Sequence, residues 1–115
     1  MTIPTTPDFI RLLDSEDTGT TSCFFDADVP AMADVVASLG HEPNGYFWEG
    51  VVRRLVEKGE LDEPDTDSEG GMFCAYGPRP AMERLAHVLT PYLTDPRALT
   101  SLVVEADAEG FDFDD

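Results

Sequence analysis

Three segments of the chain carry apolar residues at the same helical spacing. Positions i, i+3, i+4 and i+7 are apolar in the ranges 32–39, 48–55 and 82–89. This spacing puts the apolar side chains on one face of a helix, and that face needs a partner surface to cover it. We therefore expect three amphipathic helices that pack on a common core.

Local signals mark where these helices begin and end. Asp28 is the expected N-cap of the first helix, and glycines follow the first two helices at positions 40 and 59. The rigid sequence Pro78-Arg79-Pro80 precedes the third helix. A fourth, shorter helix is expected from Asp95 to Val103, because Asp95 before Pro96 forms a typical helix start.

Short β-like runs lie between the helices. Residues 9–13 and 22–25 are separated by a polar stretch that suits a hairpin loop, and residues 72–76 follow a double-glycine turn. Residues 60–67 are expected to pair with that strand, and Pro64 confines them to a sheet edge. The predicted fold is α+β, a small antiparallel sheet with three to four amphipathic helices packed mainly on one face.

The size of the chain predicts a single domain over residues 1–115. No stretch approaches the roughly 20 apolar residues that span a bilayer. The N-terminus lacks a basic region followed by an apolar run, so nothing directs export. We expect a cytoplasmic protein without membrane association.

Acidic residues outnumber basic ones by 24 to 7, which gives a formal net charge of -17. Self-repulsion of this size opposes compaction, so we expect the charge to serve a partner rather than the fold. It excludes nucleic-acid phosphates and anionic membranes and favours basic proteins and cations. The charge gathers in two tracts, at 57–69 and 105–115, and the second is predicted to be a short strand or a loosely docked tail.

Enzymatic interpretations have little support in the sequence. His41 and His87 are the only histidines, and no nucleophile, nucleotide or dinucleotide motif is present. We interpret His87 as a partly buried structural residue and His41 as surface polarity at a helix end. We expect neither catalytic residues nor a cofactor, although a cleft with a strongly perturbed carboxylate or histidine would favour an enzyme.

Metal binding is also not expected. Cys23 and Cys74 lie in apolar runs and are predicted to be free thiols, because no paired metal-ligand spacing accompanies them. The alternating acids from Asp65 to Glu69 resemble the front of an EF-hand loop, but position 12 of that loop would be Tyr76 instead of a glutamate. The alternative is a solvated acidic hairpin.

Three adjacent aromatic residues, Tyr46, Phe47 and Trp48, open the second helix. Adjacent helical residues point about 100° apart, so all three cannot face one core. Trp48 fits the apolar stripe and is predicted to anchor the core. Tyr46 is predicted to lie at the surface, where it and Glu49 suit a protein interface.

The stretches NGYFWEGVVRRLVEK and EGGMFCAYGPRPAMERLAHVL resemble the immunity protein 51 family of bacterial polymorphic-toxin systems. The resemblance covers about residues 45–89. It implies an α+β domain that binds and neutralises a toxin made by the same cell or its kin. The positions that match the family pattern are Gly45, Tyr46, Trp48, Glu49, Gly70, Phe73, Ala75 and Tyr76.

Charge and resemblance together predict a non-enzymatic inhibitor of a basic nuclease toxin, because dense charge of one sign accelerates capture of an oppositely charged partner. One alternative is a phosphate-mimicking regulator of a host nucleic-acid-binding protein. A second is that the acidity adapts solubility to high salt. The predicted partner-binding residues are Asp62, Glu63, Asp65, Asp67, Glu69, Tyr76, Tyr46 and Glu49.

Overall fold

A computed structural model describes residues 7–30 and 32–113 of the chain and confirms the α+β prediction. The described residues form a four-stranded antiparallel sheet, in the order β1-β2-β4-β3, and four helices. In chain order the elements are β1 (Arg11–Asp14), β2 (Thr21–Asp26), α1 (Ala33–Ser38), α2 (Gly45–Glu57), β3 (Asp65–Thr66), β4 (Met72–Gly77), α3 (Arg79–Thr94) and α4 (Pro96–Ala108).

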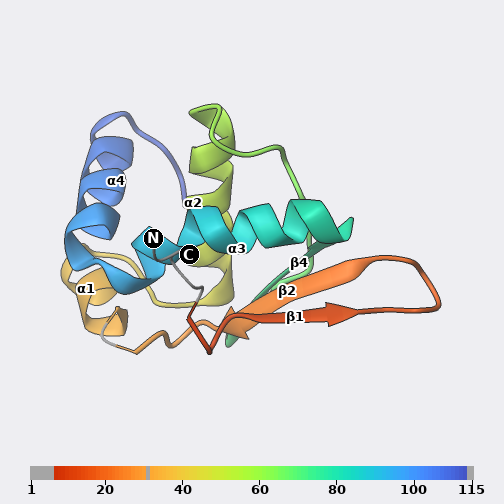
Figure 1. The fold of residues 1–115 in the computed structure, drawn as a ribbon. Coiled ribbons are helices and arrows are strands. Elements are labelled where there is room, and N and C mark those ends of the chain that lie inside the picture. Colours follow the sequence, from red (N-terminus) through yellow and green to blue (C-terminus); the bar gives the residue numbers. More distant parts are fainter. Residues whose placement is uncertain (1–6, 31, 114–115) are drawn as a thin grey trace, which may run out of the picture.

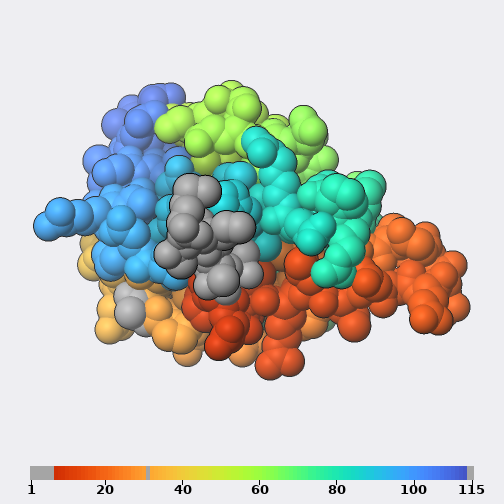
Figure 2. Space-filling model, in the orientation of Figure 1, coloured from red at the N-terminus to blue at the C-terminus, as the bar shows by residue number. Residues whose placement is uncertain are grey.

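The helices pack on one face of the sheet, as expected. Strand alternation places Cys23, Phe25, Phe73 and Ala75 on that face, where all four are buried. α3 crosses over β1, β2 and β4, and α2 packs on β4 (Figure 1). Tyr76 lies on the opposite face, where 38% of it is exposed. The turn between β1 and β2 projects from the body of the molecule (Figure 2).

The aromatic triplet of α2 divides as predicted. Phe47 and Trp48 are fully buried, whereas 44% of Tyr46 is exposed. The indole N–H of Trp48 donates to the carbonyl oxygen of Ala27 at 3.1 Å, and its ring meets the edge of Phe25. Trp48 therefore anchors α2 to the end of β2 by packing and by a hydrogen bond.

Two helix starts carry side-chain caps. The carboxylate of Asp95 accepts from the backbone N–H of Arg97, which confirms the predicted start of α4. Asn44 caps α2 by accepting from the N–H of Phe47 at 2.8 Å. Gly40, the expected stop after α1, has a φ of +85°, a conformation that glycine adopts without steric cost.

The predicted N-cap of the first helix is wrong. The backbone N–H of Ala27 donates to Gly71 and so extends the sheet by one bond, and Ala27 and Val29 are drawn into the core. Asp28 is left exposed between them, and α1 begins only at Ala33 without a side-chain cap.

The third helix is longer than its apolar stripe indicates, because it continues through Pro91 to Thr94. Proline removes one backbone donor and crowds the preceding turn. On either side of Pro91, the hydroxyls of Thr90 and Thr94 donate to the backbone carbonyl oxygens four residues earlier. The burial of Leu93 stabilises the extra turn.

Over the residues that the structure describes, the terminal segment forms no strand and docks onto the core, which was the other predicted outcome. Residues 105–108 complete α4, and only 1% of Phe113 is exposed. The Phe113 ring stacks on Phe47 with centroids 5.3 Å apart. Residues 114–115 of the predicted tract lie outside the described part of the chain.

The His41 interpretation is confirmed in part, and the His87 interpretation is wrong. His41 follows the end of α1, where its N–H donates to the carbonyl oxygen of Val36, but its side chain is not at the surface, since it is only 14% exposed and lies against Phe113. Its Nε2 atom lies 2.9 Å from the carboxylate of Asp107, and this contact joins the loop after α1 to α4. His87 is exposed on α3 instead of partly buried, because it falls outside the apolar stripe of that helix.

Candidate protein-binding surface

The first acidic tract connects α2 to β4 and is held at several points. Leu61 is 8% exposed and anchors the middle of the connection in the core. The guanidinium of Arg84 on α3 donates to the carbonyl oxygen of Glu60 at 3.2 Å. β3 then pairs with β4, with Asp65 opposite Tyr76 in the register. The connection is thus fixed to both α3 and the sheet.

Its second half is held by hydrogen bonds around Ser68. The Ser68 N–H donates to the carboxylate of Glu49 on α2 at 3.0 Å, and the Ser68 hydroxyl accepts from the N–H of Cys74. The N–H of Asp67 donates to the carbonyl oxygen of Cys74. Glu49, predicted as a partner contact, therefore also positions the acidic tract.

Gly45 brings the start of α2 against the turn that precedes β4. Its N–H donates to the carbonyl oxygen of Gly70 at 3.1 Å. A Cβ atom at position 45 would collide with the carbonyl oxygens of Glu69 and Met72. The close approach requires glycine and leaves neighbouring Tyr46 exposed.

Five of the predicted residues form an exposed set that we call the acidic rim. Within residues 7–30 and 32–113, none of their carboxylates makes an ion pair or a side-chain hydrogen bond. Because their backbone is fixed and their charges are uncompensated, these side chains are available to an external cation. The acidic rim consists of Asp62, Glu63, Asp65, Asp67 and Glu69.

Several acids outside the rim are used internally. The buried Arg54 guanidinium lies 2.9 Å from Glu109 and 3.3 Å from both Glu57 and Glu105. Hydrogen bonding to Glu109 raises the pKa of Arg54 above its usual value, so this side chain remains charged. The contacts with Glu105 and Glu109 join α2 to α4 and its C-cap, whereas the contact with Glu57 lies within α2. The acids of the second tract that contact Arg54 thus have a structural role.

The rim acids also act on the strand beside them. Burial raises the pKa of the Cys74 thiol, and the charges of Asp67 and Glu49 raise it further. Burial raises the pKa of Cys23 to about 12. Both cysteines are free in the structure. Among the described residues, no group of three His, Cys, Asp or Glu side chains is arranged to hold a metal ion.

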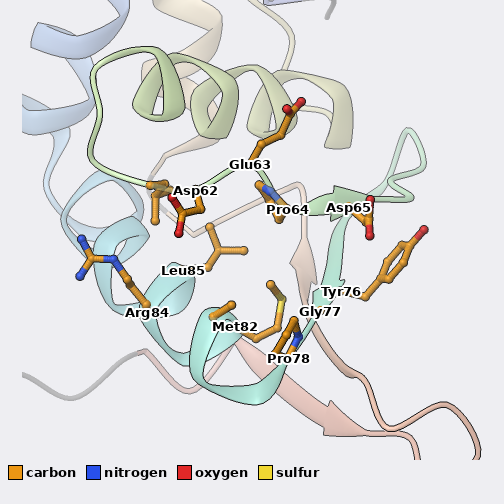
Figure 3. Close-up of a pocket in the computed structure, with 12 residues that line it drawn as sticks. Asp62, Glu63, Pro64, Asp65, Tyr76, Gly77, Pro78, Met82, Arg84 and Leu85 are labelled. Carbon is orange, nitrogen blue, oxygen red and sulfur yellow. The ribbon is translucent and has the colours of Figure 1, made fainter.

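A groove of about 270 Å³ lies between the 61–65 segment and the first half of α3 (Figure 3). Met82 and Leu85 point into it from α3. Asp65 and Tyr76 stand at one end, and Asp62 and Arg84 stand at the other. Glu63 is directed toward α2. The apolar lining of the groove comes from Leu61, Pro64, Pro78, Ala81, Met82 and Leu85.

The structure thus gathers some predicted site residues and separates others. Asp62, Glu63, Asp65 and Tyr76 line the groove, while Tyr46 lies at the start of α2 beside the turn that carries Glu69. Sequence patterns did not reveal the groove, since its apolar residues come from three segments. Leu61, a lone apolar residue inside the acidic tract, was the one available signal.

Comparison with known proteins found no matching family model, no matching curated protein and no matching solved structure. Among the residues that the structure describes, no helix is long and apolar enough to cross a membrane.

Proposed function

We propose that this protein is a non-enzymatic immunity protein that binds and neutralises a basic toxin, most simply a nuclease, through the acidic rim. The observation that carries the proposal is the division among the acids. The five rim carboxylates are exposed and unpaired in the described structure, whereas those of Glu57, Glu105 and Glu109 pair with Arg54. A basic surface is the natural complement of such a rim. The assignment to a toxin rests on the resemblance of residues 45–89.

The physical basis is fast capture followed by occlusion. Charge complementarity raises association rates from about 10⁵–10⁶ to as much as 10⁸–10⁹ M⁻¹s⁻¹ at low salt. Extended backbone separates alternate residues by about 7 Å, so Asp65 and Asp67 offer two anionic groups in a row on one side of the strand. Such a row imitates consecutive phosphates and competes for the basic groove of a nuclease.

The test compares two variants that lose the same five charges. The first replaces the five rim acids by Asn or Gln, and the second neutralises five exposed acids elsewhere. Binding to the purified toxin is followed by stopped flow between low and physiological salt. We expect the rim variant to associate at least about tenfold more slowly and to lose most of its salt dependence. The control positions are Asp8, Glu16, Asp17, Asp28 and Asp34.

Equal loss in both variants would assign the effect to net charge instead of the rim, and unchanged kinetics in both would overturn the proposal. Where a toxin gene lies beside the gene for this protein, co-expression of the two tests the biological role, since an immunity protein restores growth. If the protein instead captures a harmless nucleic-acid-binding protein of the host and restores no growth, the regulatory alternative replaces the toxin assignment.

A further inference from the structure

The groove in Figure 3 has the size of a side-chain pocket. Sites for drug-sized ligands and cofactors span about 300–1,000 Å³, and this groove of about 270 Å³ falls below that range. Met82 and Leu85 form the floor and are almost fully buried, so the apolar surface that a ligand can cover comes mainly from the exposed Pro78 and Ala81 and the half-buried Pro64. One long side chain with an apolar stem fits these dimensions.

The two ends of the groove differ in charge. At one end the carboxylate of Asp65 has no partner among the described residues, and Tyr76, its cross-strand neighbour, is 38% exposed. At the other end one acidic and one basic side chain, Asp62 and Arg84, line the groove. Among the described residues of the lining, Arg84 is the one basic residue, so a cation is attracted more strongly to the end formed by Asp65 and Tyr76.

We propose that this groove receives an arginine side chain of the basic partner. Its aliphatic stem lies along Pro64, Pro78 and Ala81, above the buried Met82 and Leu85, and its guanidinium meets the Asp65 carboxylate beside the Tyr76 ring. Arginine suits this end better than lysine because its planar group pairs with a carboxylate and stacks on an aromatic ring at once. A second copy of the chain is disfavoured, because each copy carries a formal net charge of -17.

The first test uses small probes and needs no partner. n-Butylguanidinium is titrated into the ¹⁵N-labelled protein, with methylguanidinium and neutral n-butylurea as matched probes. We expect saturable amide shifts at residues 61–65, 76–78 and 81–85. Each buried methylene contributes about fourfold in affinity, so methylguanidinium should bind at least about tenfold more weakly. Butylurea should also bind more weakly, because it lacks the charge. Shifts spread over all acidic segments, or equal binding of butylurea, would overturn the proposal.

Two variants extend the test. Ala81 is exposed and lines the groove, so Ala81→Trp should fill it with little effect on folding, which circular dichroism verifies. Ala108→Trp, at the exposed end of α4, is the matched control. Ala81→Trp and Asp65→Asn should each abolish the butylguanidinium shifts, and the control should retain them. Retained shifts in Ala81→Trp would overturn the assignment of the groove.

The inference rests on the proposed function, so its last test separates the two. With the purified toxin, Ala81→Trp should raise the dissociation rate at least about tenfold and leave association nearly unchanged, since a pocket contact acts after encounter. If Ala81→Trp binds like Ala108→Trp while the rim variant is impaired, the pocket proposal fails and the function stands. If neither Ala81→Trp nor the rim variant differs from the wild type in its binding to the toxin, both proposals fail.

Discussion

Phe113 offers the sharpest test of the fold, because a position so close to the end of the chain is rarely expected to hold a core together. Its ring is 1% exposed and stacks on Phe47, and its edge contacts reach Phe111 and His41 at centroid distances of 4.9 Å. Phe113→Ala removes this ring. The remaining space is bounded by α2, so it cannot close without moving a helix that also contacts the sheet.

The expected loss follows from two contributions. Full burial of a phenylalanine side chain contributes about 1.5–3 kcal/mol, and a cavity that relaxes only in part raises the total cost of Phe→Ala to about 3–5 kcal/mol. Domains of this size are stable by about 5–15 kcal/mol. We therefore expect Phe113→Ala to lose about 3–4 kcal/mol, a large part of the total.

Urea unfolding measures this loss. Trp48 is the only tryptophan and is buried beside Phe47, so its fluorescence reports the region directly. Phe113→Leu, which keeps most of the volume, should cost less than about 1.5 kcal/mol, and the exposed Val104→Ala should cost less than about 0.5 kcal/mol. A loss below about 1 kcal/mol for Phe113→Ala would refute the docking of this segment.

Gly50 provides a second perturbation of the same contact. A Cβ atom there would lie 2.8 Å from both Cδ1 and the carbonyl oxygen of Phe113. Gly50→Ala should therefore displace the segment and cost about 1–3 kcal/mol by overpacking. In the double variant with Phe113→Ala the total loss should be smaller than the sum of the two single losses, because the ring no longer meets the methyl and no longer holds the backbone of residue 113 against it. Strict additivity would indicate that the two residues do not meet.

Two further predictions concern single residues. The Cys23 thiol keeps its proton in the folded protein up to a pKa of about 12, but it ionises near 8.5 when unfolded. The unfolded state binds fewer protons between these values, so the stability should fall as pH rises from about 9 to about 12, and Cys23→Ala should fall less steeply. Urea titrations at several pH values test this, and equal slopes would contradict it. Asn44→Ala removes the cap of α2 and should cost about 1 kcal/mol, whereas Asn44→Asp should cost less than about 0.5 kcal/mol, since both residues cap well; thermal unfolding compares the two.

Much of the fold was predictable because the decisive signals are local. Apolar stripes identified three helices, and Asp95 before Pro96 identified the start of α4. The β-like runs and the turn signals between them indicated the strands of the sheet. These features depend on neighbours within one turn or one strand, and the structure confirms them.

The features that sequence reasoning missed depend on residues far apart in the chain. Asp28 has the residue type of a cap, but the hydrogen bond from Ala27 to Gly71 directs the chain into the core first. His41 is enclosed by residues from α2 and α4. Composition also does not distinguish a carboxylate that is paired within the fold from one that is exposed and unpaired. Only the structure separates the acids that neutralise Arg54 from those of the acidic rim.

The central pairing of β2 with β4 ties the acidic rim to the rest of the fold. Asp26 lies opposite Met72, so the two strands close a long loop that contains α2 and the whole acidic rim. Closing so long a loop is slow, and the rim is held in its final arrangement by contacts to β4, α2 and α3 together. A partly folded chain carries the same net charge, but its rim carboxylates are not held in the same arrangement. A partner that recognises the arrangement should therefore bind only the completed fold and, by mass action, raise the stability of the entire chain instead of the rim alone.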